Sequence, residues 1–206
     1  MLKVKICGIT NLKDALLAEK LGADLLGFIF YAKSLRYVSP SEVNKIIPQL
    51  SPFTRKVGVF VNEPVSKVLR MARNMKLDFV QLAGEESLAY VRKVQLKVPV
   101  IKAFRVGSDF RPTAFKNSLA QLFLMDTEVD GFYGGSGKTF DWKKISFLKG
   151  DSRLMLAGGI GAGNIREAYQ ALRPAAVDLT SSVESRPRKK DPAKLKKFFE
   201  VVNALR

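Results

Sequence analysis

Short apolar runs recur along the whole chain, and they predict β-strands. They cover residues 3–6, 25–30, 57–61, 79–82, 98–103, 121–125, 153–156 and 175–179. Most of these runs are almost continuously apolar, which is typical of parallel strands covered on both faces. Their first residues lie about 20 to 33 positions apart, which is the length of a strand plus a return helix.

The segments between the runs carry apolar residues at helical spacing. One such stripe follows Pro64 and consists of Val65, Val68, Leu69 and Ala72. A second helix is expected after Ser39, with Pro40 at its first position and Glu42 three residues beyond the cap. The last helix is expected after Asp191. We interpret the stripes as faces that pack against the core.

Eight alternating strand–helix units predict an α/β fold. In a chain of 206 residues they favour a (βα)₈ barrel that occupies residues 1–206 as a single domain. A doubly wound open sheet is the alternative. Its dinucleotide-binding version is disfavoured because no Gly-x-Gly-x-x-Gly motif follows the first strand.

The charge balance suggests an anionic partner. Thirty-five Lys and Arg residues against nineteen Asp and Glu give a net charge of +16. The basic segment 186–197 lacks interleaved aromatic residues, so we expect no nucleic-acid partner. The longest uncharged stretch, 154–165, is too short for a membrane span. Lysines near the N-terminus argue against a signal peptide, so we expect a cytoplasmic protein without a membrane partner.

The chain contains no histidine and a single cysteine, Cys7. The lack of histidine excludes Ser-His-Asp and Cys-His catalysis and every metal site built on histidine. Proton transfer must therefore use Asp, Glu, Lys, Tyr or Cys side chains. A lone cysteine cannot form an intrachain disulfide, which fits a reducing compartment.

Polar residues gather where the predicted strands end, and in a barrel these ends form the active-site rim. Cys7 ends the first strand two residues after Lys5, whose ammonium is expected to favour the thiolate. Asp126 ends the sixth strand, where partial desolvation is expected to raise its pKa. The alternatives are an inert buried cysteine and a carboxylate that caps a helix or forms an ion pair.

Small and hydroxyl residues after the last two strands predict a phosphate site. They are Gly158, Gly159, Thr180, Ser181 and Ser182, near Asp178 in the eighth strand. A second glycine-rich segment, 134–137, is either another anion site or a mobile loop.

Several of these segments carry longer motifs. They are KICGIT at 5–10, GFIFYAKSLRYVSP at 27–40, VGVFVNE at 57–63, VQL and GEE within 80–86, GGSGKTFDW at 134–142, AGGI at 157–160, and VE and KKD within 183–191. Together, and in this order, they make the chain resemble the phosphoribosylanthranilate isomerase family of tryptophan biosynthesis.

The resemblance implies a (βα)₈ barrel that catalyses an Amadori rearrangement of a phosphosugar without cofactor or metal. It implies that Cys7 is the general base and Asp126 the general acid. It also implies that Arg36 holds the anthranilate carboxylate of the substrate. The other residues expected to bind substrate are Gly158, Gly159, Asp178, Thr180, Ser181 and Ser182. The oligomeric state is expected to be a monomer or a homodimer.

Three positions depart from the family pattern. Ala83 replaces a histidine, and Ser182 and Arg188 replace glycines. We expect Ser182 to alter the backbone angles of the phosphate turn, because glycine alone adopts positive φ freely. Weakened or shifted substrate binding would follow. The rival functions are a related sugar-phosphate enzyme, such as the aminoaldose isomerase of histidine biosynthesis or a ribulose-phosphate epimerase, and a basic, non-catalytic nucleic-acid-binding protein.

Overall fold

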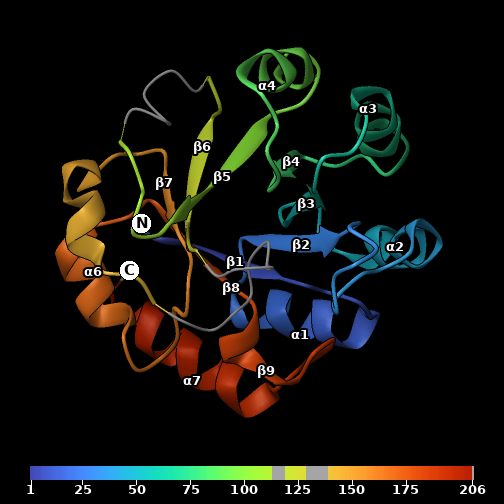
Figure 1. The fold of residues 1–206 in the computed structure, drawn as a ribbon. Helices are drawn as coiled ribbons and strands as arrows, with labels where there is room; N and C mark the ends of the chain where they lie inside the picture. Colours follow the sequence, from blue (N-terminus) through green and yellow to red (C-terminus); the bar gives the residue numbers. More distant parts are fainter. Residues whose placement is uncertain (113–118, 129–138, 206) are drawn as a thin grey trace.

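The computed structural model describes residues 1–112, 119–128 and 139–205, and in it eight parallel strands close into a barrel (Figure 1). The strands are β1 (Lys3–Cys7), β2 (Leu25–Ile29), β3 (Arg55–Phe60), β4 (Phe79–Leu82), β5 (Val100–Val106), β6 (Leu122–Thr127), β7 (Leu154–Leu156) and β8 (Ala176–Leu179). Because β1 pairs with both β2 and β8, the barrel is confirmed and the open sheet is excluded.

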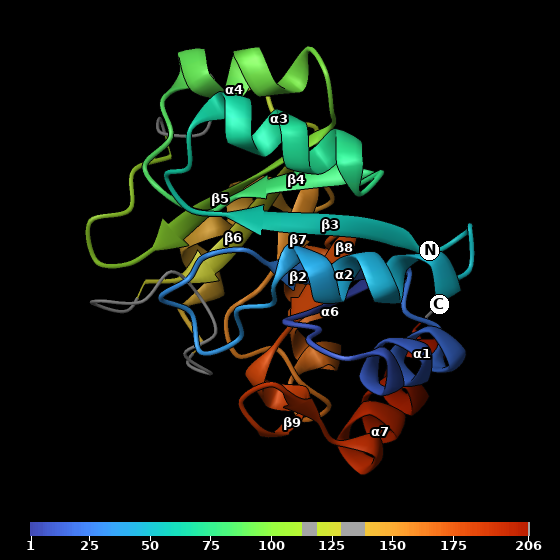
Figure 2. The same ribbon diagram turned by 90° about the vertical axis from the view of Figure 1, so that its right-hand side faces the viewer.

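Helices surround the barrel (Figures 1 and 2). They are α1 (Leu12–Leu21), α2 (Pro40–Ile46), α3 (Val65–Asn74), α4 (Leu88–Gln95), α6 (Ile165–Leu172) and α7 (Pro192–Asn203), with a 3₁₀ segment η2 (Trp142–Leu148). The predicted caps are confirmed: Ser39 accepts a hydrogen bond from the Glu42 amide, and Asp191 accepts from the amides of Ala193 and Lys194. The predicted glycine-rich segment 134–137 lies outside the described residues.

Two strands end two or three residues later than the sequence predicted, and both changes affect the rim. β5 was expected over 98–103 but runs to Val106, and β6 was expected over 121–125 but runs to Thr127. The two strands extend each other, since Arg105 pairs in register with Asp126 and Val106 with Thr127. Asp126 is therefore held within the sheet rather than in the loop after it.

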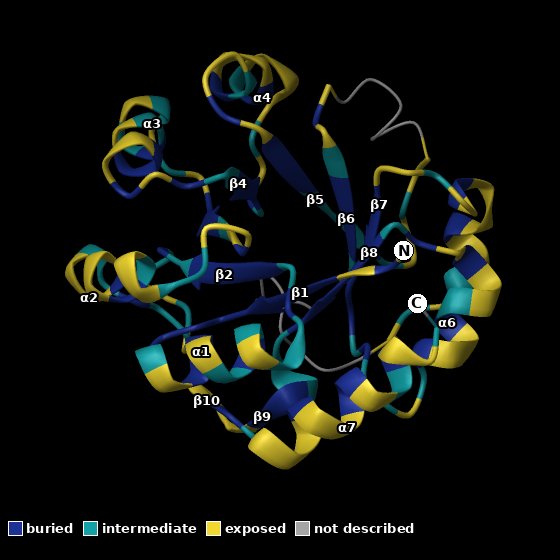
Figure 3. Ribbon diagram, turned by 180° about the vertical axis from the view of Figure 1, so that it is seen from behind, coloured by how far each residue is buried: buried dark blue, intermediate teal, exposed yellow. Residues whose placement is uncertain are grey.

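The core has two layers of apolar side chains, and in Figure 3 most of each strand is coloured as buried. Inside the barrel, the buried apolar side chains form one cluster: Leu25, Val57, Ile101, Leu124, Met155, Ala157 and Ala176. The larger layer lies between the strands and the apolar stripes of the helices. Because alternate strand residues face opposite layers, both faces are apolar, which explains the continuous apolar runs. Within the described part of the chain, no helix is long and apolar enough to span a membrane.

A short hairpin, which the sequence did not predict, follows β8. It consists of β9 (Glu184–Arg186) and β10 (Lys189–Lys190), joined to β8 through a 3₁₀ turn, η3 (Ser181–Val183). The hairpin precedes α7 and reaches the end of β1, because Lys190 donates a hydrogen bond to the Cys7 carbonyl.

Candidate active site

A pocket opens among the carboxyl ends of the strands. In Figure 2 the arrowheads of β3 and β5 both point to the left, toward this end. The lining residues are Cys7, Ile29, Tyr31, Ser34, Arg36, Val59, Val61, Gln81, Asp126, Asp178 and Thr180. Five residues predicted from the sequence thus meet in one place: Cys7, Arg36, Asp126, Asp178 and Thr180. Outside this lining lie Gly158, Gly159, Ser181 and Ser182.

Cys7 ends β1 and is 4% exposed. Its neighbour in register is Gly27 on β2, where an added Cβ would lie 2.7 Å from the Cys7 sulfur. Glycine at this position therefore leaves the space that the thiol occupies.

Lys5 favours the Cys7 thiolate, as the sequence predicted, but the net shift of the Cys7 pKa is upward. Lys5 is fully buried, and its Nζ lies 3.0 Å from Oδ1 of Asp178. Burial raises the pKa of Cys7, Lys5 opposes this, and the Asp178 carboxylate raises the pKa again. The lysine charge is already matched by a carboxylate, so burial of the thiol dominates.

Lys5 itself remains charged despite its burial. Burial disfavours the ammonium, but the Asp178 carboxylate and the Cys7 sulfur outweigh this and raise the pKa of Lys5. The pair also joins β1 to β8, where Lys5 and Asp178 stand in register.

Asp126 has the raised pKa that the sequence predicted. Burial raises the pKa of Asp126 to about 6, while a hydrogen bond from the Thr127 amide to Oδ1 (2.8 Å) opposes the shift. Such a carboxyl group is partly protonated near neutral pH and can act as a general acid.

Gly158 supports Asp126 from the adjacent strand end. It has φ of 78°, and an added Cβ would lie 2.9 Å from the Thr127 amide nitrogen and 3.3 Å from Oδ1 of Asp126. A side chain at position 158 would therefore crowd both Thr127 and the candidate acid.

Arg36 lies in the loop after β2, and its guanidinium is held by Glu184. Its Nε donates to both carboxylate oxygens (3.1 and 3.0 Å), and Nη2 donates to Oε2 (2.8 Å). The Arg36 side chain packs against the backbone of Gly8, where an added Cβ would lie 2.8 Å from Cδ of Arg36. Among the described residues, Nη1 of Arg36 has no hydrogen-bond partner, which leaves one edge for a ligand carboxylate.

The predicted phosphate residues lie on two adjacent loops. A Cβ at Gly161 would lie 3.3 Å from Cβ of Ser182, so the loop after β7 packs against the turn after β8. Asn164 fixes the first loop, because its side chain donates to the Gly159 carbonyl and accepts from the Gly161 amide.

The expectation that Ser182 alters the backbone angles of the phosphate turn stays a prediction. Ser182 lies in the 3₁₀ turn and is absent from the non-glycine residues with positive φ in the described part of the chain. Arg188 is among them, with φ of 73°. Its carbonyl accepts from Thr10 (2.9 Å), and its Nη1 donates to the Tyr37 carbonyl (2.8 Å). Arg188, which replaces a glycine of the family pattern, therefore adopts the left-handed backbone conformation, and these contacts offset the strain of that conformation.

The sequence did not identify three residues of the site as functional. Gln81 on β4 faces the pocket, and Glu184 and Lys190 on the hairpin hold Arg36 and the end of β1. Their signals were present: a glutamine in an apolar strand, and the VE and KKD motifs. Residues 1–112, 119–128 and 139–205 contain no group of three or more carboxylate or cysteine side chains placed to hold a metal ion.

Comparison with known proteins gives a consistent result. The model of the N-(5'-phosphoribosyl)anthranilate (PRA) isomerase family matches residues 4–201. The N-(5'-phosphoribosyl)anthranilate isomerase of Thermotoga maritima is 45% identical over 206 residues, 100% of both chains. The crystal structure of phosphoribosyl anthranilate isomerase from Thermus thermophilus has a TM-score of 0.91 at 40% identity and covers 100% of both chains.

A further crystal structure contains phosphoribosyl anthranilate isomerase in complex with reduced 1-(o-carboxyphenylamino)-1-deoxyribulose 5-phosphate. It has a TM-score of 0.86 at 40% identity and covers 99% of this chain and 100% of the other. The family model and these relatives span the chain almost from end to end. This chain therefore belongs to the family of N-(5'-phosphoribosyl)anthranilate isomerases, the aldose–ketose isomerases of tryptophan biosynthesis.

Proposed function

We propose that the pocket converts N-(5-phosphoribosyl)anthranilate into 1-(2-carboxyphenylamino)-1-deoxyribulose 5-phosphate, with Asp126 as general acid and Cys7 as general base. The observation that carries this assignment is the meeting of a carboxyl group of raised pKa with the chain's single thiol in one pocket. The two side chains come from β6 and β1, three strands apart around the ring. A substrate between them can gain a proton on one side and lose one on the other.

The first step opens the sugar ring. Asp126 protonates the ring oxygen, the bond between this oxygen and C1 breaks, and the nitrogen lone pair forms an iminium bond to C1. The positive charge is strongly electron-withdrawing, so the proton on C2 becomes acidic. No external electron acceptor is needed, because the substrate's own iminium group accepts the electron pair.

The second step removes the C2 proton. The Cys7 thiolate takes this proton, and the electron pair of the broken bond forms the C1–C2 double bond of an enolamine. Protonation at C1 and loss of the proton on the C2 hydroxyl then give the aminoketose. The iminium charge also attracts the thiolate, which offsets the raised pKa of Cys7 in the free protein.

Arg36 and the two loops provide binding sites for the two anionic ends of the substrate. The free edge of the Arg36 guanidinium suits the planar carboxylate of the anthranilate ring. Backbone amides and hydroxyls suit the phosphate, with Asp178 at a ribose hydroxyl. The residues assigned to the phosphate are Gly158, Gly159, Thr180, Ser181 and Ser182.

We further propose a cytoplasmic protein whose residues 1–206 act as one catalytic domain on a small phosphosugar, as a monomer or a homodimer. An exposed aromatic side chain supports the homodimer. Phe53 is 88% exposed and lines a cavity of about 440 Å³ with Leu25, Phe79 and Leu122, at the ends where the strands begin. Sedimentation at several protein concentrations distinguishes the two states.

The test of the function is steady-state turnover of freshly prepared phosphoribosylanthranilate in the presence of a chelator, followed by the loss of anthranilate fluorescence. Turnover that is lost in Asp126→Asn supports both the reaction and the acid. A folded protein without turnover contradicts the proposal, and the aminoaldose of histidine biosynthesis would be the next substrate to try.

A further inference from the structure

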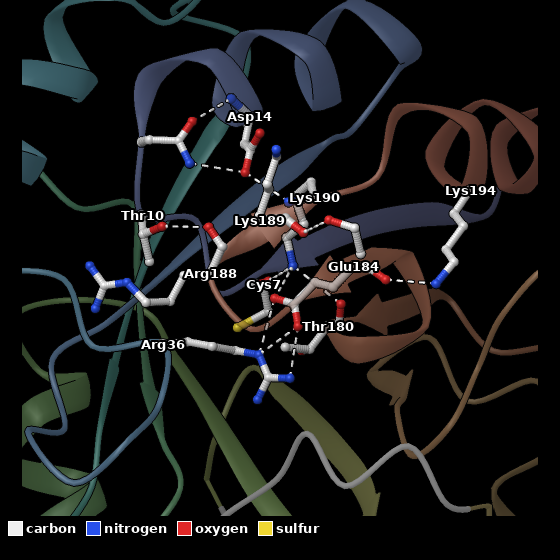
Figure 4. Close-up of polar contacts among 12 residues, drawn as sticks. Cys7, Thr10, Asp14, Arg36, Thr180, Glu184, Arg188, Lys189, Lys190 and Lys194 are labelled. Carbon is white, nitrogen blue, oxygen red and sulfur yellow. Dashed lines mark hydrogen bonds and ion pairs between the residues drawn. The ribbon is translucent and has the colours of Figure 1, made fainter.

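Three ionic side chains form a buried row beside the pocket (Figure 4). Arg36 and Lys190 both bind the carboxylate of Glu184, with Nη2–Oε2 at 2.8 Å and Nζ–Oε1 at 3.1 Å. The side chains are 11%, 1% and 3% exposed for Arg36, Lys190 and Glu184. Of the three, only Arg36 lines the pocket.

Lys190 also binds the backbone at two strand ends. Its Nζ donates to the carbonyl of Cys7 at 2.6 Å and to the carbonyl of Thr180 at 3.2 Å. The third donor goes to Glu184, so the ammonium uses all of its hydrogen-bonding capacity. One cation therefore links the end of β1, the turn after β8 and the carboxylate that holds Arg36.

Stability alone is a weak reason for such a row, because a buried ion pair is often no more stabilising than apolar residues of equal size. Burial lowers the pKa of Lys190, and Glu184 opposes that shift. Two cations share one carboxylate, so the row carries surplus positive charge. Arg36 is the cation of this row that lines the pocket, so an anionic ligand bound there can balance the surplus charge.

We propose that Glu184 and Lys190 are positioning residues that couple recognition of the substrate carboxylate to placement of the base. Glu184 fixes the plane of the Arg36 guanidinium, and Lys190 fixes Glu184 together with the backbone of Cys7 and Thr180. This inference rests on the proposed function, in which Arg36 binds the anthranilate carboxylate.

The two residues are expected to affect different kinetic constants. Glu184→Gln keeps the size of the side chain but frees the guanidinium, so KM is expected to rise about tenfold while kcat changes less than about threefold. Lys190→Met removes the hydrogen bond to the Cys7 carbonyl, so kcat is expected to fall about tenfold or more. Glu42→Gln removes a carboxylate from an exposed pair with Lys45 and serves as the charge control.

The decisive experiment compares two ligands by calorimetry: the reduced product, 1-(2-carboxyphenylamino)-1-deoxyribitol 5-phosphate, and its phenylamino counterpart without the carboxylate. In Glu184→Gln the affinity for the first is expected to fall about tenfold, while the affinity for the second stays within about twofold. Equal loss for both ligands would mean a merely structural role and would overturn the proposal.

A mutant cycle with Arg36→Ala provides the second measurement. If Glu184 acts through Arg36, adding Glu184→Gln to Arg36→Ala leaves the affinity for the carboxylated ligand unchanged. Additive losses would overturn the proposal. Should Glu184→Gln not fold, Glu184→Asp can be used in the same mutant cycle, because its shorter side chain moves the carboxylate away from Arg36. Absence of wild-type turnover, by contrast, would refute the proposed function itself.

A separate observation concerns Gln81, which lines the pocket near the carboxyl end of β4. The residue is 6% exposed, and its Oε1 is buried without a hydrogen-bond partner among the described residues. Its neighbours in register are Val59 on β3 and Ile101 on β5, neither of which has a polar side chain. A buried amide oxygen without a hydrogen-bond donor is costly unless a ligand supplies the donor.

We infer that the Gln81 amide binds the substrate, accepting a hydrogen bond from the arylamine N–H or a ribose hydroxyl. This inference also rests on the proposed function. Gln81→Leu is expected to weaken binding of the reduced product about tenfold. Its Tm is expected to rise, because an unpaired polar group leaves the interior. Unchanged affinity, or weakened affinity with a lower Tm, would overturn the inference. Turnover by the wild-type protein tests the proposed function separately.

Discussion

Lys5 and Asp178 form a buried ion pair beside the thiol of Cys7, with 3.0 Å between Nζ and Oδ1. The carboxylate holds the lysine charge, so that lysine stabilises the thiolate less than an unpaired ammonium would. The resting protein therefore holds Cys7 as a neutral thiol, and the substrate's own positive charge must help to ionise it.

Replacing the carboxylate tests this relationship. In Asp178→Asn, Lys5 loses its counter-charge and Cys7 loses a nearby negative charge, so the pKa of Cys7 is expected to fall. The rate of alkylation by iodoacetamide as a function of pH measures this pKa without ambiguity, because Cys7 is the single cysteine. Asp151→Asn, which breaks the surface pair with Arg153, is the control. An unchanged or higher pKa of Cys7 in Asp178→Asn would contradict this electrostatic account.

The pH dependence of kcat/KM is expected to be bell-shaped. Its acidic limb should lie near pH 6, the pKa of Asp126, and its basic limb above the usual pKa of a thiol, because burial raises the pKa of Cys7. Between the limbs, the productive form, with Asp126 protonated and Cys7 ionised, is a constant minor fraction. Rates measured from pH 4.5 to 10 check this, and an acidic limb that persists in the residual activity of Asp126→Asn would exclude Asp126 as its source.

The raised pKa of Asp126 should also make folding stability depend on pH. The pKa of Asp126 is 3.8 when unfolded and about 6 when folded, so the folded state holds a proton that the unfolded state releases between these values. The unfolding free energy therefore decreases as pH rises through this window. Asp126→Asn removes this cost of burying a carboxylate, so the variant is expected to be more stable than wild type by about 3 kcal/mol at pH 8 and equally stable at pH 3.5. Urea unfolding at both pH values measures the difference, and a less stable variant at pH 8 would contradict the raised pKa.

Gly158 is expected to matter through Asp126. A methyl group there would press on the Thr127 amide and on Oδ1 of Asp126, so Gly158→Ala is expected to lower kcat about tenfold. Gly150 offers a matched control, because its φ of 77° is nearly the same as the 78° of Gly158 and a Cβ there meets nothing within 4 Å. Gly150→Ala should lose stability through backbone strain but retain full turnover. Equal kcat values for the two variants would show that Gly158 does not position the acid.

The barrel and its rim could be predicted from the sequence because both depend on local patterns. Continuous apolar runs at the spacing of a strand plus a helix require doubly covered parallel strands. The carboxyl ends of such strands meet, so Cys7 and Asp126 had to share a rim. The raised pKa of Asp126 also followed locally, from a carboxyl group at the mouth of an apolar strand.

The errors concern pairings between distant residues. The pKa of Cys7 is raised by burial of the thiol, and the Asp178 carboxylate, which adds to this rise, lies 173 positions from Lys5 along the chain. Arg36 was predicted to bind a ligand, but its partner Glu184, 148 positions away, was not identified. The positive φ of Arg188 was not predicted, because it depends on the shape of the hairpin. The effect of Ala83 on substrate binding stays a prediction.

The central claim, that Cys7 removes the C2 proton while Asp126 supplies a proton to the ring oxygen, is tested most directly by kcat of Cys7→Ala with phosphoribosylanthranilate. Cys7→Ala is expected to lower kcat by roughly 10²–10⁴, the usual loss for general acid–base catalysis, while the affinity for the reduced product changes less than about threefold. A Cys7→Ala enzyme with wild-type kcat would contradict the assignment of the base and, with it, the mechanism.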